Sequence, residues 1–416
     1  MSDAAALERV LAAIDPDAAI ALLRKAIATP SVTGTEAAIA RLLREELLAI
    51  GLDQVEAFDF VPGRANVWGR WGAGHGPKLL FAGHTDTVAV TGWAAEWGGT
   101  ERENPFGGAI VDGAMWGRGA ADMKAGVVAA VAALKAIRAA GYRPRGEVLT
   151  AFVGDEESGE SGSGLSDGMR AIVARMADGS IPTPDFAIYP EPTTLDVYTA
   201  QMGFLIADIT VHGVSAYFGL PWRGVDALKG AHKLLDRLFA YSDELWARTE
   251  HPLLGRAFLL VTTIAGGGYI AVPDLVRLSL IRKILPSETV ESARAELQGI
   301  VDLFAMNEGL RSEIAFTAAR DSRSGGRPSE VDAESDAIRL LTGIVRMATG
   351  KERVITGAPF WAEASFFIHD LGVPTVYCGP GDISHCHTTR ERVDLDEFLT
   401  AVRIFASLIV EYCGVQ

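Results

Sequence analysis

Histidine and acidic side chains recur in this sequence directly after short apolar runs. The sequence places His84 with Asp86 after 78–83, Glu156 with Glu157 after 147–154, and Glu191 after the run that begins at 185. In an open α/β sheet the carboxyl ends of the strands line the ligand crevice. We therefore expect these side chains to converge although they lie far apart in the sequence.

Two further residues extend this set. Asp122 stands in "GRGAADMKAG" before a helical pattern, and His387 stands in "HCHTTRE". Each residue alone has an ordinary alternative: a histidine at a strand end is often only a hydrogen-bonded structural group, and Asp-Glu-Glu after a strand is often a solvated turn. Asp122 itself could cap the helix that follows it. Their shared position at one predicted sheet edge favours a common site.

Imidazoles mixed with carboxylates suit Zn, Mn or Co. Two divalent ions roughly 3.5 Å apart need a carboxylate that they share, together with further ligands for each ion. One carboxylate must stay free of metal to take a proton from the attacking water. Two adjacent glutamates can divide that work between ligand and base, so the set predicts a two-metal hydrolase.

Bulk properties narrow the class of protein. The chain has 416 residues, 49% of them hydrophobic and 22% charged, which predicts a soluble globular protein of two or three domains. The net charge of −15 argues against nucleic acid and anionic membranes as partners. Three cysteines are too few for a disulfide framework, and the N-terminus has no apolar signal segment. We expect a cytoplasmic protein that acts on a small molecule.

Strands and helices alternate in the first part of the chain, which predicts an α/β domain with helices on both faces of a largely parallel sheet. Thr33 and Glu36 form the pattern of a capping box before a helix that Gly51 ends. After residue 202 the runs 204–213, 258–267 and 275–285 have the half-alternating polarity of an antiparallel sheet. We predict a catalytic domain over 1–202 and 321–416, interrupted by an α+β domain over 203–320.

Five motifs together resemble a known family. "GHTDTV", "GRGAADMKAG", "DEESG", "YPEPT" and "GPGDISHCHTTRERV" are similar, in this order, to the aminoacylase, acetylornithine deacetylase and carboxypeptidase family of two-metal metallopeptidases. The resemblance runs from about residue 20 to the C-terminus. It implies a zinc-peptidase-like α/β/α domain with a mixed sheet, and an inserted ferredoxin-like lid that often forms the dimer. A homodimer through the lid is therefore expected.

The resemblance also implies roles for single residues. His84 resembles a ligand of one metal, and Asp86 resembles the carboxylate that orients it. Asp122 resembles the bridging ligand, which is often followed by a cis peptide, and Glu156 resembles the general base. Further ligands are implied at Glu157, at Glu191 on the same ion as His84, and at His387 on the other ion. Two divalent ions per subunit are implied, with Zn, Mn and Co all open.

The lid departs from the family pattern at two polar positions. In "GVSAYFGLPWRG" Tyr217 stands where the family has a histidine that stabilises the oxyanion, and in "GGGYIAVPD" Ile270 stands where it has an asparagine. For the family's lid arginine the sequence offers Arg282 or Lys283. Spacing from the following proline favours Lys283, whereas alternation with apolar residues favours Arg282 as a substrate-binding group.

Three functions remain open from the sequence. The first is an amidohydrolase or deacetylase of an N-acylated amino acid or a related amide. The second is an aminohydrolase of an activated aromatic amine such as a nitroanthranilate, which the aromatic Tyr217 favours. The third is an inactive binding protein on the same fold, against which the adjacent glutamates Glu156 and Glu157 argue.

Overall fold

The computed structural model describes residues 4–157, 164–352 and 354–416. The chain divides into two compact units, and each is described by itself. Unit 1 contains the chain up to Thr199 together with Val331–Thr356 and Ala362–Gln416. Unit 2 contains Ala200–Glu330 and Gly357–Trp361, so it extends beyond the predicted 203–320 at both ends. Nothing in the sequence indicated that residues 357–361 belong to unit 2.

A mixed sheet forms the centre of unit 1, with the strand order β1-β2-β6-β3-β7-β18-β8-β16 and with β17 beside β8; β16 and the last residues of β8 and β17 are counted with unit 2. Its strands are β1 (Gln54–Val61), β2 (Arg64–Gly72), β3 (Lys78–His84), β6 (Glu147–Val153), β7 (Phe186–Tyr189), β8 (Val197–Gln201), β16 (Ser329–Glu330), β17 (Ile355–Ala358) and β18 (Thr375–Tyr377). Strands β6, β3, β7 and β18 run parallel, whereas β1, β2 and β8 pair antiparallel. The parallel core confirms the predicted alternation.

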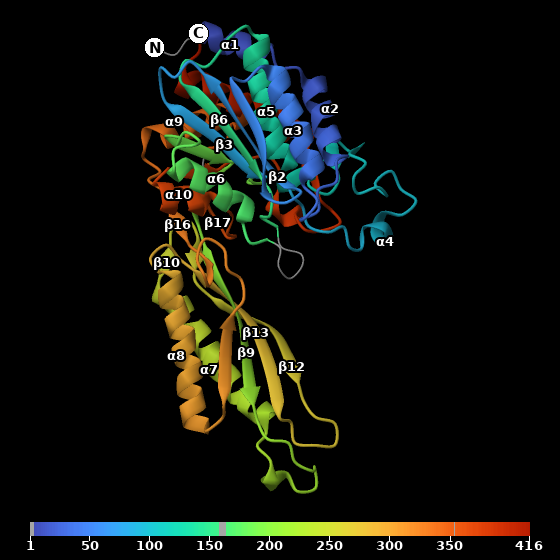
Figure 1. Ribbon diagram of the computed structural model, residues 1–416, viewed down its shortest axis with the longest axis vertical. Coiled ribbons are helices and arrows are strands. Elements are labelled where there is room, and N and C mark those ends of the chain that lie inside the picture. Colours follow the sequence, from blue (N-terminus) through green and yellow to red (C-terminus); the bar gives the residue numbers. More distant parts are fainter. Residues whose placement is uncertain (1–3, 158–163, 353) are drawn as a thin grey trace. The chain divides into compact units, whose positions relative to one another are not determined.

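Helices cover both faces of this sheet (Figure 1). The helices of unit 1 are α1 (Ala4–Ala12), α2 (Pro16–Ile27), α3 (Ala37–Ile50), α4 (Trp93–Trp97), α5 (Ala125–Ala139), α6 (Asp167–Ala177), α9 (Asp336–Thr349), α10 (Ala364–Leu371) and α11 (Leu395–Leu408). Helices α3 and α5 pack on one face, with α11 against α5, and α6 and α10 pack on the other. A small separate sheet joins β4 (Ala109–Val111), β5 (Ala114–Trp116) and β19 (Arg392–Asp394).

Helix α3 begins and ends for different reasons. Gly51 ends it in the left-handed conformation with φ 82°, as predicted. The predicted capping box is wrong, because the helix begins after Glu36 and no side chain caps it. The Glu36 carboxylate instead accepts the Gly34 N–H at 2.9 Å and pairs with Arg64. Thr33 is hydrogen-bonded to a residue of the candidate site described below.

Unit 2 is an antiparallel sheet with two long helices packed together on one face. Its main elements are β9 (Gly203–His212), α7 (Ala227–Arg248), β12 (Leu259–Gly266), β13 (Leu275–Ile284), α8 (Val290–Glu308) and β14 (Ser312–Phe316). The short strands β10 (Glu250–His251) and β11 (Gly255–Arg256) form a hairpin, and β15 (Gly325–Gly326) pairs with β9. The strand order β12-β13-β9-β14 is that of a ferredoxin-like βαββαβ fold.

Alternating burial explains how this sheet holds its helices. Along β13, Val276, Leu278 and Leu280 are fully buried with the apolar faces of α7 and α8, while Arg277 between them is exposed. Such alternation is expected where one face of an antiparallel sheet is covered and the other meets water. Strand β12 lies at one edge of the sheet and leaves Leu260 and Ile264 each 53% exposed.

Two further features bear on the predicted class of protein. All three cysteines, Cys378, Cys386 and Cys413, are buried and unpaired, which agrees with the absence of a disulfide framework expected from their number. In the described part of the chain, no helix combines the length and apolar character needed to cross a membrane.

Candidate metal centre

The parallel strands bring the predicted ligands to one edge of the sheet in unit 1. His84 is the last residue of β3 and pairs with Val153 at the end of the neighbouring strand β6. Glu156 and Glu157 follow β6, and Glu191 follows β7 on the other side of β3. The last two residues of the "DEESG" motif, 158 and 159, lie outside the described residues.

His84, Asp122 and Glu191 form the first ligand group. The Nε2 atom of His84 lies 3.0 Å from Asp122 Oδ1 and 3.8 Å from Glu191 Oε1. All three side chains are buried. Potential ligand atoms of the three residues lie within 4.8 Å of one another, which is compact enough for one ion.

Asp122, Glu157 and His387 form the second group. The Nε2 atom of His387 lies 3.1 Å from Asp122 Oδ2 and 3.0 Å from Glu157 Oε1. Asp122 therefore turns one carboxylate oxygen to each histidine, the arrangement that a bridging ligand requires. The peptide bond from Asp122 to Met123 is cis, as the resemblance implied.

Glu156 lies beside these groups. It forms a third compact set with His84 and Glu157. Its side chain is partly exposed, whereas that of Glu157 is buried. The more accessible glutamate is thus the one predicted to act as the base.

Asp86 supports the site in a different way from the one expected. Its carboxylate Oδ1 is 3.9 Å from His84 Nδ1, whereas its backbone oxygen is 3.0 Å from the same nitrogen. The carboxylate instead accepts the N–H groups of Glu156 at 3.3 Å and Glu157 at 2.9 Å, and the Thr33 hydroxyl at 2.9 Å. The Asp86 side chain therefore positions the two glutamates, and its backbone orients the imidazole.

Glu391 is a buried supporting residue that sequence reasoning missed. Its carboxylate accepts the backbone N–H groups of Ala121 at 3.2 Å and Asp122 at 3.1 Å, and it forms an ion pair with Arg118. It thereby fixes the loop that carries the shared carboxylate. In the sequence Glu391 stands between two arginines in "TTRERV", where an acid is ordinarily read as a surface residue. The one signal that could have found it is its position two residues after "HTT", the segment that begins with His387.

Glu363 is a second buried acid near the centre that the sequence did not reveal. It accepts a hydrogen bond of 2.9 Å from Tyr189 Oη, and Tyr189 lies two residues before Glu191. Burial raises the pKa of Glu363 to about 8. The contact joins the start of α10 to the end of β7.

Crowded negative charge dominates the electrostatics of the centre. Burial raises the pKa values of Glu156 and Glu191 well above their usual range, and neighbouring carboxylates add to that rise although His84 opposes it. Burial also raises the pKa of Asp86 to about 7. Hydrogen bonds to Asp122 and Glu157 raise the pKa of His387 to about 11.

These shifts fit a site for divalent cations. Within the described residues, no lysine or arginine forms an ion pair with Asp122, Glu157 or Glu191. Buried acids without a protein cation are costly unless they are protonated or coordinate metal. The donor set of two imidazoles and three carboxylates, with one carboxylate shared, suits two ions of the Zn, Mn or Co type.

Comparison with known sequences identifies the family. The sequence profile of Peptidase family M20/M25/M40 matches residues 80–411. The chain belongs to this M20 family. It is 30% identical over 337 residues to a succinyl-diaminopimelate desuccinylase of Dechloromonas aromatica, covering 79% of this chain and 83% of that one. It is also 30% identical over 406 residues to a desuccinylase of the same name from Dinoroseobacter shibae, covering 94% and 98%.

Solved structures show the same fold. The dipeptidase Dug1p of Saccharomyces cerevisiae superposes with a TM-score of 0.76 at 17% identity, covering 98% of each chain. The M20 metallo-carboxypeptidase Sso-CP2 of Sulfolobus solfataricus gives 0.75 at 15% identity, covering 95% of this chain and 99% of that one. With its family established, the chain is a metal-dependent hydrolase with the predicted α/β fold.

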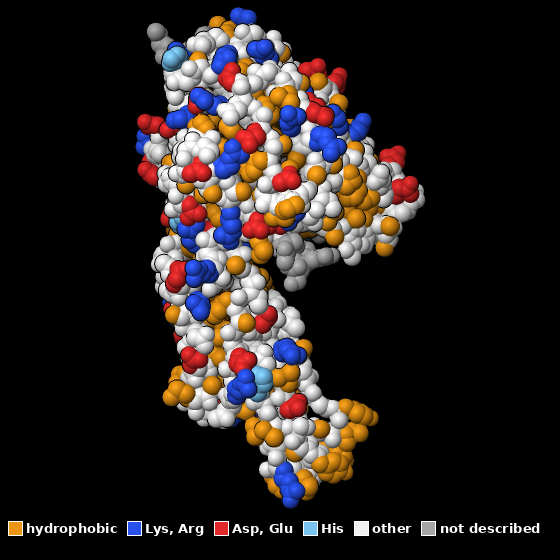
Figure 2. All heavy atoms as spheres, in the orientation of Figure 1, with side chains coloured by type: hydrophobic (Ala, Val, Ile, Leu, Met, Phe, Trp, Pro, Cys, Tyr) orange, Lys and Arg blue, Asp and Glu red, His pale blue; other side chains and the backbone are white. Residues whose placement is uncertain are grey.

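The M20 chain carries exposed aromatic residues at one end of unit 2. Tyr217 is 62% exposed and its ring lies 4.5 Å from that of Phe218. The loop with Tyr217 pairs with the loop that holds Ile270, through a bridge between Tyr217 and Ala271. Figure 2 shows hydrophobic side chains gathered over these loops, which follow β9 and connect β12 to β13. Tyr217 therefore does not pack in the core of unit 2.

Arg282 is occupied within unit 2. It is fully buried on the same face of β13 as Leu278 and Leu280, as alternation predicted. Its guanidinium pairs with Glu288 and lies 3.4 Å from Tyr241 Oη. These contacts account for the buried charge, so the predicted substrate-binding role of Arg282 gains no support from this geometry. Burial lowers the pKa of its neighbour Lys283 to about 8.

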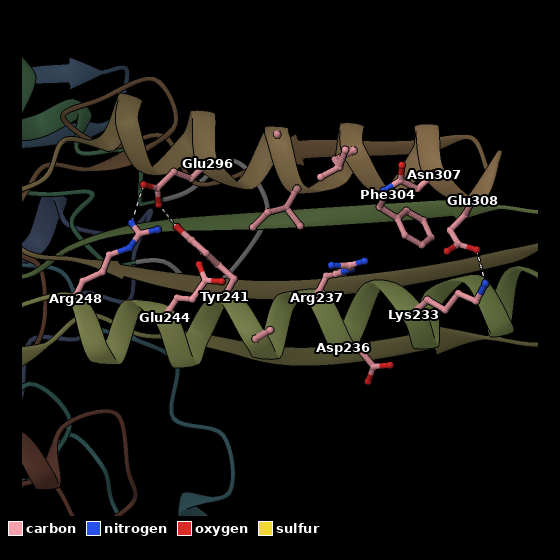
Figure 3. Close-up of a pocket in the computed structure, with 14 residues that line it drawn as sticks. Lys233, Asp236, Arg237, Tyr241, Glu244, Arg248, Glu296, Phe304, Asn307 and Glu308 are labelled. Carbon is pink, nitrogen blue, oxygen red and sulfur yellow. Dashed lines mark hydrogen bonds and ion pairs between the residues drawn. The ribbon is translucent and has the colours of Figure 1, made fainter.

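An open pocket of about 660 Å³ lies between α7 and α8 (Figure 3). Figure 3 shows ion pairs crossing it, from Lys233 to Glu308 and from Arg248 to Glu296. None of the site residues predicted from the sequence lines this pocket. Its mixed and mutually paired charges mark it as a solvated groove between two packed helices.

Proposed function

We propose that this M20 enzyme is a two-metal amidohydrolase that removes the acyl group from an N-acylated amino acid. The observation that carries the proposal is Asp122, whose two carboxylate oxygens lie 3.0 Å from His84 Nε2 and 3.1 Å from His387 Nε2. A carboxylate placed between two imidazoles is what a pair of ions would share. The named relatives supply the substrate class, since both are desuccinylases of an amino acid.

His84, Asp122 and Glu191 would hold one ion, and Asp122, Glu157 and His387 the other. The bound ions would polarise the scissile carbonyl and make water more acidic. Whether they are Zn, Mn or Co stays open, because this donor set accepts all three.

Glu156 is the proposed general base. Its carboxylate takes a proton from water as the water oxygen attacks the amide carbon, and it then delivers that proton to the amine nitrogen as the carbon–nitrogen bond breaks. One carboxyl group thus acts first as base and then as acid, and it returns to its starting state when the amine leaves. The hydrogen bond from the Glu156 N–H to Asp86 fixes the backbone of the base.

The direct test is a substrate screen with two readouts. Metal-loaded protein is incubated with N-succinyl and N-acetyl amino acids, with dipeptides and with nitroaromatic amines, and free amine and ammonia are measured separately. Release of amino acid from an N-acyl substrate, without ammonia, is expected. Release of ammonia from an aromatic amine alone would favour the aminohydrolase instead.

The two other functions gain nothing from these observations. An inactive binding protein would have no use for Glu156 beside a complete ligand set, and no relative named above is an aromatic aminohydrolase. Tyr217 stays a predicted substrate contact, and Tyr217→His against Tyr217→Phe would separate its hydroxyl from its ring.

We also propose a homodimer formed through unit 2. Support comes from the exposed edge strand β12, with Leu260 and Ile264 outward, because unpaired edge strands readily pair with a second chain.

A cytoplasmic location and the absence of nucleic-acid and membrane partners stay predictions from composition and charge.

A further inference from the structure

A second pocket in unit 1, of about 460 Å³, lies apart from the metal-centre residues. Its walls are Trp97, Arg102, Val111, Asp112, Ala114, Trp116, Arg390 and Arg392. None of the proposed metal ligands lines it. Three arginines around one cavity are unusual in a chain whose net charge is −15.

Aromatic rings hold two of these arginines. The Arg102 guanidinium carbon lies 4.2 Å from the ring centre of Trp116 and 4.6 Å from that of Trp97. The Arg392 guanidinium carbon lies 4.7 Å from the same Trp116 ring. Stacking on indole fixes the position of a guanidinium and leaves its charge available to an anion.

Carboxylates neutralise this cluster only in part. Arg102 lies 4.0 Å from Asp112, whose side chain is 94% exposed, and Arg390 pairs with Glu96 at 3.2 Å. Arg392 donates to the Arg390 carbonyl at 3.0 Å, and no carboxylate of the described residues lies within ion-pair distance of it. Arg392 interacts electrostatically with Asp382 without forming an ion pair, so the positive charge beside Trp116 is only partly compensated.

The Trp116 indole contributes a buried donor beside the arginine cluster. Its Nε1 atom is buried and has no hydrogen-bond partner among the described residues. A buried donor without an acceptor is costly, and most such groups in proteins are satisfied. Trp116 also lines the pocket and carries both stacked guanidinium groups, which an anion entering the pocket would meet.

The frame of the pocket is held in place. Trp97 Nε1 donates to the Thr389 carbonyl at 2.6 Å, and the Gly117 N–H donates to the Glu391 carbonyl at 3.2 Å. Glu391, which lies between Arg390 and Arg392 in the sequence, is the buried residue that holds the Asp122 loop. A fixed frame lowers the ordering cost of binding.

We propose that this pocket is a binding site for a small anion that carries a carboxylate or phosphate group. Guanidinium groups recognise both anions, through charge and paired hydrogen bonds. The site is separate from the metal centre and needs no ion there. Arg390 and Arg392 flank Glu391, which supports the Asp122 backbone, so an anion bound here would contact the segment that holds Asp122 in place.

The test is isothermal titration of the metal-loaded full chain with inorganic phosphate and, separately, with succinate, at an ionic strength kept constant with chloride. The two titrations distinguish phosphate from carboxylate as the preferred group. Saturable binding of at least one anion is expected, with the dissociation constant raised about tenfold or more by Arg392→Gln and by Arg102→Gln.

Arg403→Gln is the matched control, because Arg403 is exposed on α11 and lies outside the pocket. It should leave the dissociation constants unchanged. Anions held at the metal centre would bind equally well to all three arginine variants, and that result would overturn the proposal. The absence of saturable binding of both anions at about 10 mM would overturn it as well. Neither outcome depends on which substrate the enzyme hydrolyses.

Discussion

Glu156 and Glu157 are neighbours in the chain with different surroundings. Glu157 is buried and its carboxylate lies 3.0 Å from His387 Nε2, whereas Glu156 is partly exposed and shares a compact group with His84 but not with His387. Their N–H groups share one acceptor, the Asp86 carboxylate. A single backbone arrangement therefore directs one side chain to the proposed ligand set and leaves the other for proton transfer.

Glu156→Gln tests this division. The amide keeps the shape of the side chain but accepts no proton, so kcat should fall on the order of 10²-fold or more while metal content and melting temperature stay near those of the parent. Steady-state kinetics and elemental analysis measure the two properties. Glu157→Gln is the control and should lose metal. If Glu156→Gln loses metal and recovers its rate on replenishment, the two roles are reversed.

The motifs in the sequence were enough to find the residues with chemistry but not those that support them. His84 and Glu191 could be found because they directly follow apolar strands, and Asp122 because it stands in a motif before a helix. Glu391 and Glu363 could not, because a buried acid acquires its partner only when distant segments fold together. The role of the Asp86 carboxylate was misread for the same reason, since its partners are backbone N–H groups.

At the scale of elements, local patterns predicted strands and helices well and helix starts less well. The alternation of β9 and β13, and the Gly51 end of α3, agree with the structure. The capping box failed because Thr33 and Glu36 have stronger tertiary partners in Asp86 and Arg64. Tertiary contacts overrode a local preference worth about 1 kcal/mol.

Helix α5 approaches the loop of Glu191 very closely at Gly126. A Cβ atom at this position would lie 2.0 Å from the Pro190 carbonyl oxygen, so no side chain fits without moving that loop. Gly126→Ala should therefore lower the free energy of unfolding by about 1–3 kcal/mol and weaken metal binding. Chemical denaturation and metal titration measure both effects.

Gly343→Ala is the control for that substitution, because Gly343 lies within α9 with nothing within 4 Å of the added atom. It should stabilise the protein by up to about 1 kcal/mol. Equal effects of the two substitutions would show that the close approach to Pro190 is unimportant.

An ion-pair cluster joins α2, α3 and α5 through Glu46, which pairs with Lys135 and, at 3.3 Å, with Lys25. Burial raises the pKa of Glu46, but the two lysines lower it more, so its pKa lies below the usual value. The ionised form is therefore stabilised by folding. This contribution is present above the unfolded-state pKa and is lost as pH falls through the lower folded-state pKa.

Lys135→Met should remove part of that pH dependence. Because both lysines are substantially exposed, the loss at neutral pH should be less than about 1 kcal/mol, and it should shrink as the solution is acidified below the usual pKa of glutamate. Urea unfolding at several pH values measures it. Arg41→Gln is the control, since Arg41 is exposed on α3 without an ion pair among the described residues. A loss that grows on acidification would contradict the assignment.

At the scale of the whole molecule, unit 2 exposes apolar surface that a second copy would cover. Sedimentation should give about twice the chain mass of 44.2 kDa. Replacing Leu260 and Ile264 together by lysine should produce monomers, because charge on an edge strand opposes pairing with another edge. Met347→Lys, at a residue 83% exposed on α9, should leave the dimer intact. A monomeric parent protein would contradict the proposed homodimer.

The metal content of the whole enzyme tests the central claim most directly. Protein loaded with excess Zn, Mn or Co and then dialysed should retain about two ions per chain, because Asp122 is placed to serve two ligand groups at once. His387→Ala should retain about one, and Asp122→Ala should lose most of both. A parent protein that retains no more than about one ion under every loading condition, or a His387→Ala variant that still retains two, would contradict the two-metal account.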